Sequence, residues 1–505
     1  MRNIMSKMAA VFLAGALVFS GNVKAAALPE ADTTTRATEV VSDASYWPSF
    51  RKDNSNMAIV DTKLPTGDTA VTEKWKTDGL GVGSPIIVGD DLYIAGGKML
   101  RRVDRITGKV LAEQEMVMST GYFSYAAYGD GKIFVPLNSG VLQAFDADTL
   151  KSLWRTQGDG QQPLCPVTYD NGNVYVGTSN GNGSVGSFYC FSSADGDTER
   201  SDEIQENIWV DEESACYWAG ATIVGQAVIY GNEKGLVQSR NKLTGEVIDS
   251  YQAESNIRGS IAYDSGRGTI YFTAKDAQKV YAMTVNGDGS FNKNKVLEGD
   301  VNGLVTSTPI AYNGRVYVMA GNITSRGGLN VFDAKTMDLI YEVDIDGPSQ
   351  SSPLLTTAYA TVENNKTVYL YVALNNSVGT VKVIKDFEGN TEPDVKDLYV
   401  PSNPQYCTAS LVSDQTGTLY YKNDSGYLWA LNTTGPELIP GDVNEDGRVD
   451  SEDALTTLQC SVGKTDISEV RFSCADVDND GKITAADALL ILQYSVGKIS
   501  DFKPK

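Results

Sequence analysis

The sequence repeats one strand pattern between Trp47 and Asn432, and this repetition limits the fold more than any other feature. Each copy has a small residue, often followed by Pro, then an apolar run, a Gly/Asp/Asn turn, a strand ending near Tyr, and a strand carrying Asp before a TG or DG turn. The copies begin at Ser84, Ser124, Cys165, Ala221, Ser260, Thr308, Ser352 and Ala409. Short strands at a period of about 40 to 50 residues, four to a unit, predict an all-β chain folded as a β-propeller. We expect eight blades, or seven if one weak copy is an insertion.

The two ends of the repeat region predict how the ring closes. The last copy stops at Asn432 without its outermost strand, and the segment 72–76, which precedes the first copy, matches that strand. A strand from the N-terminal end would therefore complete the last blade and leave no open sheet edge. Trp75, Trp154 and Trp209 occupy the same outer-strand position in three places, so we expect structural roles for them.

The chain of 505 residues contains no histidine and has a formal net charge of −22. Without histidine, Ser-His-Asp triads, His-ligated zinc and CxxCH haem attachment are excluded. The acidic balance argues against nucleic acid and anionic lipid as partners, because basic side chains supply the affinity for both. None of the six cysteines lies in a CxxC pair, and Cys460 and Cys474 could either pair or stay reduced.

Residues 1–27 have the pattern of a secretory signal peptide. Arg2 and Lys7 accompany an apolar stretch from Met8 to Phe19 that is too short to span a bilayer comfortably, and small residues follow it. Residues 28–45 are rich in Thr, Ala, Asp and Glu and are expected to form a flexible leader. The sequence therefore predicts a secreted, extracellular protein with no membrane span.

Two copies of a loop-and-helix unit, 441–464 and 475–498, follow a short linker at 436–440. In each copy, oxygen-bearing side chains occupy positions 1, 3, 5, 9 and 12 of a twelve-residue loop, and Gly occupies position 6. With the position-7 residues, which would offer backbone carbonyls, the metal-ligand candidates are Asp442, Asn444, Asp446, Arg448, Asp450 and Asp453, then Asp476, Asp478, Asp480, Lys482, Thr484 and Asp487. This spacing wraps oxygens around one calcium ion per loop, so we expect two calcium ions. Apolar helices are expected over 454–462 and 488–496, which an acidic solvated tail would not explain.

The repeats resemble the PQQ-like β-propeller family, whose blades have roughly the pattern SPxVxxGxVYVGxxxGxLYALDxxTGxxLW. The opening Trp47-Pro48-Ser49-Phe50-Arg51 is also similar to the start of such domains, and we place the propeller at 46–435. The resemblance implies the fold but not one function, since members include quinone-cofactor dehydrogenases and non-catalytic assembly or binding proteins. The chain lacks the vicinal Cys-Cys of many of the enzymes, so PQQ is not expected as a cofactor.

The C-terminal module, 441–505, resembles type I dockerins over its whole length. Asp in place of the EF-hand Glu at position 12, and a following helix without a clear incoming one, match that family. The resemblance implies docking onto a cohesin domain of a scaffold protein, as in cellulosome-like, polysaccharide-degrading assemblies at the cell surface. In dockerins the partner is read at the two residues before the last ligand and on the helix. The corresponding residues are Ser451, Glu452, Leu458, Gln459, Ala485, Ala486, Leu492 and Gln493.

Loops that precede the innermost strands of a propeller meet at its axial face, where ligands usually bind. The aromatic, amide and Arg side chains in these loops are Tyr122, Phe123, Tyr217, Trp218, Arg258, Gln350, Gln405 and Tyr406. Such side chains suit a sugar, although the same residues could instead pack the ring or the rim. We expect a non-catalytic carbohydrate- or protein-binding module. The alternative is a polysaccharide-active enzyme such as a glycoside hydrolase, but no local motif selects its two carboxylates.

Overall fold

The computed structural model describes residues 47–122, 124–163, 165–201, 203–321, 327–433, 440–444, 449–465, 467, 472, 474–499 and 501–502. The predicted signal peptide and leader lie outside these residues, as do the candidate site residues Phe123, Asp446 and Arg448. Among the described helices, none is both long enough and apolar enough to cross a membrane.

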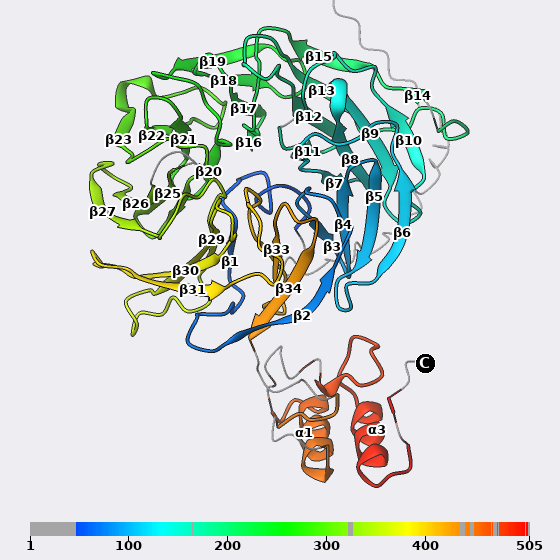
Figure 1. Ribbon diagram of the computed structural model, residues 1–505. Coiled ribbons are helices and arrows are strands. Elements are labelled where there is room, and N and C mark those ends of the chain that lie inside the picture. Colours follow the sequence, from blue (N-terminus) through cyan, green and yellow to red (C-terminus); the bar gives the residue numbers. More distant parts are fainter. Residues whose placement is uncertain are drawn as a thin grey trace, which may run out of the picture. The chain divides into compact units, whose positions relative to one another are not determined.

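Eight twisted sheets, each built on four antiparallel strands, surround a common axis and confirm the predicted eight-bladed propeller (Figure 1). Blades 1 to 4 comprise β3 (Ile86–Val88), β4 (Asp91–Gly96), β5 (Met99–Asp104) and β6 (Val110–Glu115); β7 (Ala127–Gly129), β8 (Lys132–Leu137), β9 (Val141–Asp146) and β10 (Ser152–Arg155); β11 (Thr168–Asp170), β12 (Asn173–Gly177), β13 (Phe188–Ser192) and β15 (Asn207–Asp211); and β16 (Thr222–Val224), β17 (Ala227–Gly231), β18 (Leu236–Asn241) and β19 (Val247–Gln252).

Blades 5 to 7 comprise β20 (Ala262–Asp264), β21 (Thr269–Ala274), β22 (Lys279–Thr284) and β23 (Leu297–Asp300); β24 (Ile310–Tyr312), β25 (Arg315–Met319), β26 (Gly328–Asp333) and β27 (Leu339–Asp344); and β28 (Leu354–Thr356), β29 (Val368–Ala373), β30 (Val381–Asp386) and β31 (Asp394–Tyr399). Blade 8 contains β32 (Val412–Ser413), β33 (Leu419–Lys422), β34 (Leu428–Thr433) and β2 (Val71–Thr77). Two extra strands, β14 (Glu203–Ile204) and β1 (Ile59–Val60), join blades 2 and 7, and two 3-10 turns lie at η2 (Asn138–Gly140) and η3 (Lys293–Lys295).

The middle strands of the blades are apolar because neighbouring blades cover both faces of each sheet. In β29 every residue is buried. In β13, Phe188 and Cys190 pack towards blade 4, whereas Tyr189 and Phe191 pack towards blade 2, as the two-residue period of a strand requires. The core is therefore a series of hydrophobic layers between blades.

The outer-strand tryptophans connect each blade to the next one. Each indole N–H donates to a backbone carbonyl oxygen of the following blade: Trp75 to Arg105 at 3.1 Å, Trp154 to Ser193 at 3.4 Å and Trp209 to Lys242 at 3.2 Å. The TG turn of blade 1 supplies Gly108 beneath the first indole, where an added Cβ would lie 2.5 Å from the ring. The structural role predicted for these tryptophans is confirmed.

The ring closes as the sequence predicts. Strand β2 pairs antiparallel with β34, from Val71 opposite Thr433 to Thr77 opposite Leu428, and supplies the outermost strand of blade 8. An N-terminal strand thus completes the last blade. Its backbone ladder with β34 ties the start of the repeat region to its end and closes the ring.

The chain before β2 forms an inner segment, residues 47–62, that the sequence did not predict. It follows the innermost strands of blades 1 to 7 in order and appears in blue inside the ring in Figure 1. Its contacts are the paired Trp47 and Ile87, Pro48 O with Tyr128 N–H, Asn54 Nδ2 with Tyr169 O, Asn56 Nδ2 with Ala221 O and Ile261 O, Met57 Sδ with Ala311 N–H, and Ala58 O with Leu355 N–H. Strand β1 then pairs parallel with β28. The inner segment therefore contacts seven of the eight blades.

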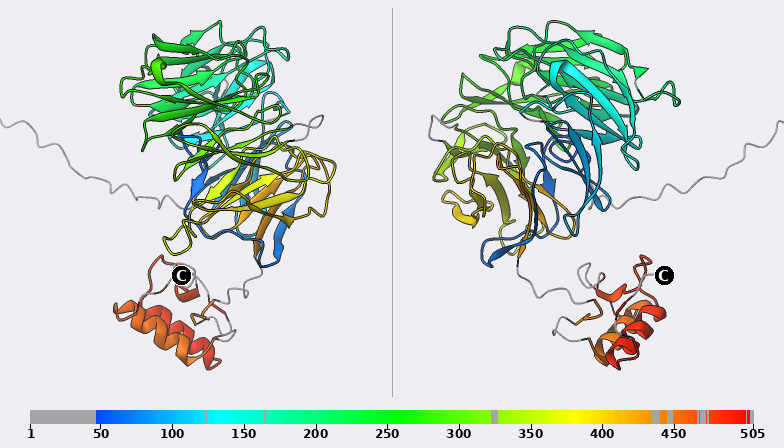
Figure 2. Two further views of the ribbon diagram at one scale, coloured as in Figure 1. Left: turned by 90° about the vertical axis from the view of Figure 1, so that its left-hand side faces the viewer. Right: turned by 45° about the vertical axis from the view of Figure 1, so that its right-hand side comes forward.

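The C-terminal module contains α1 (Ser451–Ser461) and α3 (Ala485–Ser495), which lie side by side (Figure 2). Both helices begin three residues earlier than the apolar pattern predicts. Asp450 and Thr484 are their N-caps, and Asp453 and Asp487 complete a capping box in each. The expected calcium ligands at positions 9 and 12 therefore also start the helices.

Candidate functional site

The second loop of the C-terminal module brings its expected ligands towards one point. Asp476, Asp478 and Asp487 each place a carboxylate oxygen within 4.8 Å of the others. Gly481 has φ of 79°, and its N–H donates to Asp476 at 2.9 Å, so the loop turns sharply at position 6. Desolvation, followed by the charges of the neighbouring Asp residues, raises the pKa of Asp478. A set of oxygen donors that repel one another fits a hard cation such as calcium.

The position-12 aspartates organise both loops in the same way. Asp453 accepts hydrogen bonds from the N–H groups of Val443 (2.8 Å), Asn444 (3.0 Å) and Asp450 (2.9 Å). Asp487 accepts from the equivalent groups of Val477 (3.1 Å), Asp478 (3.4 Å) and Thr484 (2.8 Å). Both aspartates are fully buried. In the first loop, Asp442 is also buried. In the second loop, Asp480 accepts a hydrogen bond from the N–H of Lys482.

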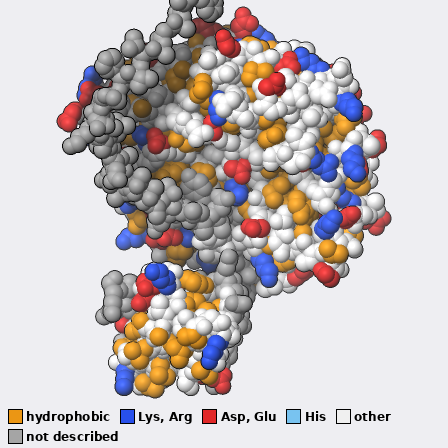
Figure 3. Space-filling view, turned by 180° about the vertical axis from the view of Figure 1, so that it is seen from behind, with side chains coloured by type: hydrophobic (Ala, Val, Ile, Leu, Met, Phe, Trp, Pro, Cys, Tyr) orange, Lys and Arg blue, Asp and Glu red, His pale blue; other side chains and the backbone are white. Residues whose placement is uncertain are grey.

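The two helices carry an exposed apolar stripe at equivalent positions. Its members are exposed by 42% to 62% and comprise Leu455 and Leu458 on α1 with its C-cap Val462, and Leu489 and Leu492 on α3 with its C-cap Val496. Hydrophobic side chains cover much of this module in the view of Figure 3. The predicted partner residues Leu458 and Leu492 belong to the stripe, Ser451, Glu452, Ala485 and Ala486 are exposed at the helix starts, and Gln459 and Gln493 are half-buried. Sequence reasoning missed the other four members, although their apolar side chains recur at the same place in both repeats.

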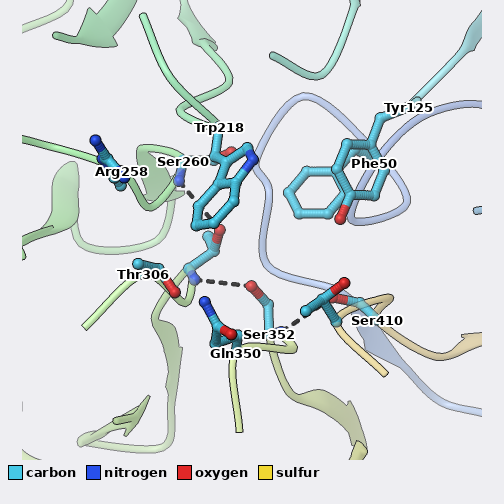
Figure 4. A pocket seen from close by; sticks show the side chains of 11 residues that line it. Phe50, Tyr125, Trp218, Arg258, Ser260, Thr306, Gln350, Ser352 and Ser410 are labelled. Atoms are coloured by element: carbon cyan, nitrogen blue, oxygen red, sulfur yellow. Dashed lines mark hydrogen bonds between the residues drawn. The ribbon is translucent and has the colours of Figure 1, made fainter. Parts of the chain in front are cut away.

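At the axial face of the propeller lies a narrow pocket with a volume of about 30 Å³. Phe50 of the inner segment and Tyr125 lie side by side, with their ring centroids 4.5 Å apart. Trp218 lies across the pocket from them (Figure 4). Hydroxyl groups at the starts of the copies link the blades around it. Each hydroxyl oxygen accepts a hydrogen bond from a backbone N–H. Gly220 N–H donates to Ser260 (2.8 Å), Ser260 N–H to Thr308 (3.2 Å), Thr308 N–H to Ser352 (2.8 Å) and Ser352 N–H to Ser410 (3.0 Å).

The structure brings together part of the predicted axial set. Trp218, Arg258 and Gln350 line the pocket. Tyr217 lies beneath Arg258, whose guanidinium carbon is 4.3 Å from the ring centroid. Arg258 also makes two hydrogen bonds of 2.8 Å to Glu233, which fix its position.

Tyr122, Gln405 and Tyr406 do not line this pocket. The Tyr122 hydroxyl donates to Asp424, and the Asp424 N–H donates to the carbonyl oxygen of Tyr406 at 2.9 Å. Gln405 accepts from the N–H of Tyr406. Sequence reasoning missed Phe50, because it belongs to the unrepeated inner segment.

The axial pocket does not fit a quinone cofactor. Its volume is too small for a fused tricyclic ring, and among its described lining residues the one cation, Arg258, is already paired with Glu233. The described lining contains no carboxylate. Beneath the Trp218 loop, Cys165 and Cys216 are buried, and burial raises the pKa of Cys216 well above its usual value, so this thiol is a poor nucleophile.

Comparisons with known proteins match both parts of the chain. Residues 440–494 match the family model described as Dockerin type I domain, and residues 96–294 match the one described as Outer membrane protein assembly factor BamB. No curated protein matches the chain.

Three similar solved structures share the propeller fold. A europium-containing methanol dehydrogenase has 12% identity and a TM-score of 0.59, with 77% of this chain and 98% of that chain covered. Quinohemoprotein alcohol dehydrogenase from Comamonas testosteroni has 13% identity and a TM-score of 0.57, covering 77% and 81%. BamB from Moraxella catarrhalis has 12% identity and a TM-score of 0.52, covering 72% and 100%. At such identities the likeness establishes the fold alone.

Proposed function

Because the chain joins a PQQ-like β-propeller to a type I dockerin domain, we propose that it is a secreted subunit of a polysaccharide-degrading complex. The dockerin attaches it to a cohesin domain on a scaffold protein, and the propeller acts as a non-catalytic module that binds carbohydrate or protein. One observation carries this proposal. The buried loop aspartates Asp453 and Asp487 accept hydrogen bonds from the N-cap residues of the two helices that bear the apolar stripe.

Calcium controls docking through these two aspartates. The first ion would be held by Asp442, Asn444, Asp446, Asp450, Asp453 and the carbonyl of Arg448, and the second by Asp476, Asp478, Asp480, Thr484, Asp487 and the carbonyl of Lys482. Bound calcium supplies the positive charge that offsets carboxylate repulsion. Asp453 and Asp487 complete the capping boxes of α1 and α3, so the loops fix where the helices begin and how the stripe is presented.

The exposed stripe supports a protein partner at this face. Six large apolar side chains at equivalent positions on two adjacent helices form a patch that soluble domains usually cover with a partner. The exposed Ser451-Glu452 and Ala485-Ala486 pairs would contact the rim of that partner, and their difference makes the two helices unequal in what they recognise.

Several features support a binding rather than a catalytic propeller. The chain has no histidine, and the described lining of the axial pocket has no pair of carboxylates. Trp218 and Gln350 instead offer a ring face and an amide, which orient ligands without chemical change.

The test is a binding measurement between the full chain and immobilised type I cohesin domains. We expect binding in calcium and a loss of at least about 100-fold with chelator or with the paired change Asp453→Ala and Asp487→Ala. Asp300→Asn, an exposed aspartate of β23, is the matched control and keeps full affinity. Equal binding with and without calcium, or no binding to any cohesin, would refute the docking role. Release of reducing sugars from starch, cellulose, xylan or pectin would replace the binding propeller with an enzyme.

A further inference from the structure

A second cavity, between blades 2 and 3, is far larger than the axial pocket. Its volume is about 380 Å³, against about 30 Å³ for the axial pocket. We call it the blade 2/3 cleft; its walls come from Gly140, from the loop at 156–159 that follows β10, from Ser187 and β13, and from residues 205–212. Small-molecule sites commonly have volumes of about 300 to 1,000 Å³, so this cleft is large enough for a ligand.

An insertion in blade 3 builds one wall of the cleft. The described parts of this insertion, 193–201 and 203–206, follow β13, and within them β14 pairs parallel with β10, the outer strand of blade 2. The Gln205 N–H then donates to Arg155 O at 2.8 Å, and the Gln205 side chain donates to Ser192 O at 3.1 Å. The insertion is therefore bonded both to the outer strand of blade 2 and to the end of β13 in blade 3.

The cleft contains an aromatic surface beside a positioned carboxylate. Tyr189 and Phe191 stack with ring centroids 5.5 Å apart and planes 22° apart. The Tyr189 hydroxyl donates to Asp159 Oδ2 at 3.2 Å, and the Thr178 hydroxyl donates to the same oxygen at 2.5 Å. The other oxygen accepts the Gln161 N–H at 2.9 Å. These three donors hold Asp159 in one orientation.

Glycine at position 140 allows this arrangement. A Cβ on Gly140 would lie 2.0 Å from Asp159 Oδ1, so any larger residue would displace the carboxylate. The backbone here has φ of 70°, which also favours glycine. The space left by Gly140 and the three hydrogen-bond donors thus keep the Asp159 carboxylate at the cleft wall.

The charge of the lining narrows the class of ligand. Its described residues include three carboxylates and three amides and no Lys or Arg: Asp159, Glu206 and Glu212, then Gln157, Gln205 and Asn207. Such a lining repels anions, and its oxygens and amides suit hydroxyl groups, while a half-exposed tyrosine offers a stacking face. We propose that the blade 2/3 cleft binds a neutral oligosaccharide segment; this rests on, and specifies, the binding role proposed for the propeller.

The test measures binding of neutral hexasaccharides to the full chain in calcium by titration calorimetry. The probes are cellohexaose, xylohexaose and mannohexaose, with hexagalacturonate as an anionic counterpart and hexalysine as a cationic one. We expect at least one neutral probe to bind, and Asp159→Asn and Tyr189→Ala each to weaken it about tenfold. Tyr189→Phe keeps the ring and loses only the hydroxyl, so it should cause a smaller loss. Asp300→Asn, with the same charge change far along the chain in blade 5, should alter affinity less than twofold.

Melting temperatures and calcium-dependent cohesin binding are measured for every variant. Variants that melt as the wild type and still bind cohesin show that a loss of sugar binding is local to the cleft. The inference is wrong if no neutral probe binds, if Asp159→Asn and Tyr189→Ala leave affinity unchanged, or if hexalysine binds in place of the sugars. Failure of cohesin binding alone would refute the docking role and leave the cleft result standing.

Discussion

At the residue scale, Trp154 and Trp218 have opposite environments. Trp154 is fully buried, lies 5.8 Å from Phe134 between ring centroids and donates to the next blade. Trp218 is half-buried in a loop with φ of 69° and lines the axial pocket. Trp154→Ala should therefore lower the free energy of unfolding by about 3 to 5 kcal/mol. Trp218→Ala should change it by less than about 1 kcal/mol. Denaturant titrations of the two variants measure both values, and equal losses would contradict this division.

Lys422 predicts a pH dependence of stability. It is 3% exposed, its Nζ donates to Gly426 O at a long 3.5 Å, and burial lowers its pKa to about 7. The unfolded chain keeps the ordinary, higher pKa, so it binds more protons than the folded chain between about pH 7 and 10. Stability should rise with pH across this window, by on the order of a few kcal/mol, and fall again as the pH returns to 7.

The comparison of Lys422→Met with the wild type isolates this effect. The variant cannot titrate at this position, so its rise in unfolding free energy from pH 7 to 9.5 should be much smaller. Lys109→Met, at an exposed position, should keep the wild-type rise. Parallel curves for Lys422→Met and the wild type would show that the buried amine does not control the trend.

Sequence and structure agree best where a residue recurs in the repeats. Trp75, Trp154 and Trp209 share one position, so periodicity alone predicted their roles. Phe50 and Asp159 have no counterparts in other copies, and their importance depends on contacts with distant residues that no local pattern encodes. For the same reason the axial set was predicted only in part.

At the element scale, β2 and the inner segment together complete the propeller. Deleting residues 46–78 removes the outer strand of blade 8 and the contacts along the inner strands of seven blades. We expect the shortened chain to aggregate and to lose its cooperative melting transition, because an edge strand and apolar surface become exposed. Size-exclusion chromatography and calorimetry measure both. Deleting residues 28–45 is the control, and a monomeric 46–78 deletion with unchanged melting would argue against this closure.

The sequence did not predict β14, and it placed the starts of α1 and α3 three residues too late. Strand β14 has two residues and forms only because β10 offers a free edge, which is a property of the folded blade. The helices α1 and α3 begin earlier than their apolar residues because side-chain caps, not hydrophobic contacts, define their first turns.

At the scale of the whole molecule, the dockerin should respond to calcium while the propeller does not. The ten side-chain ligand candidates include eight aspartates, and the propeller's core consists of apolar layers between blades. Chelation should remove the helical circular-dichroism signal and the dockerin's calorimetric transition, and leave the propeller's transition within about 1 °C. Two transitions that move together under chelator would contradict this independence.

The path of the inner segment has a consequence for biosynthesis. Residues 47–62 meet blades 1 to 7 in the order in which those blades leave the ribosome, but β2 must wait for β34, more than three hundred residues later. A nascent chain can therefore acquire its blades one by one while the seam stays open, with an unpaired strand at its start. Translation stalled before residue 428 should leave a protease-sensitive N-terminal region, and release of the full chain should protect it.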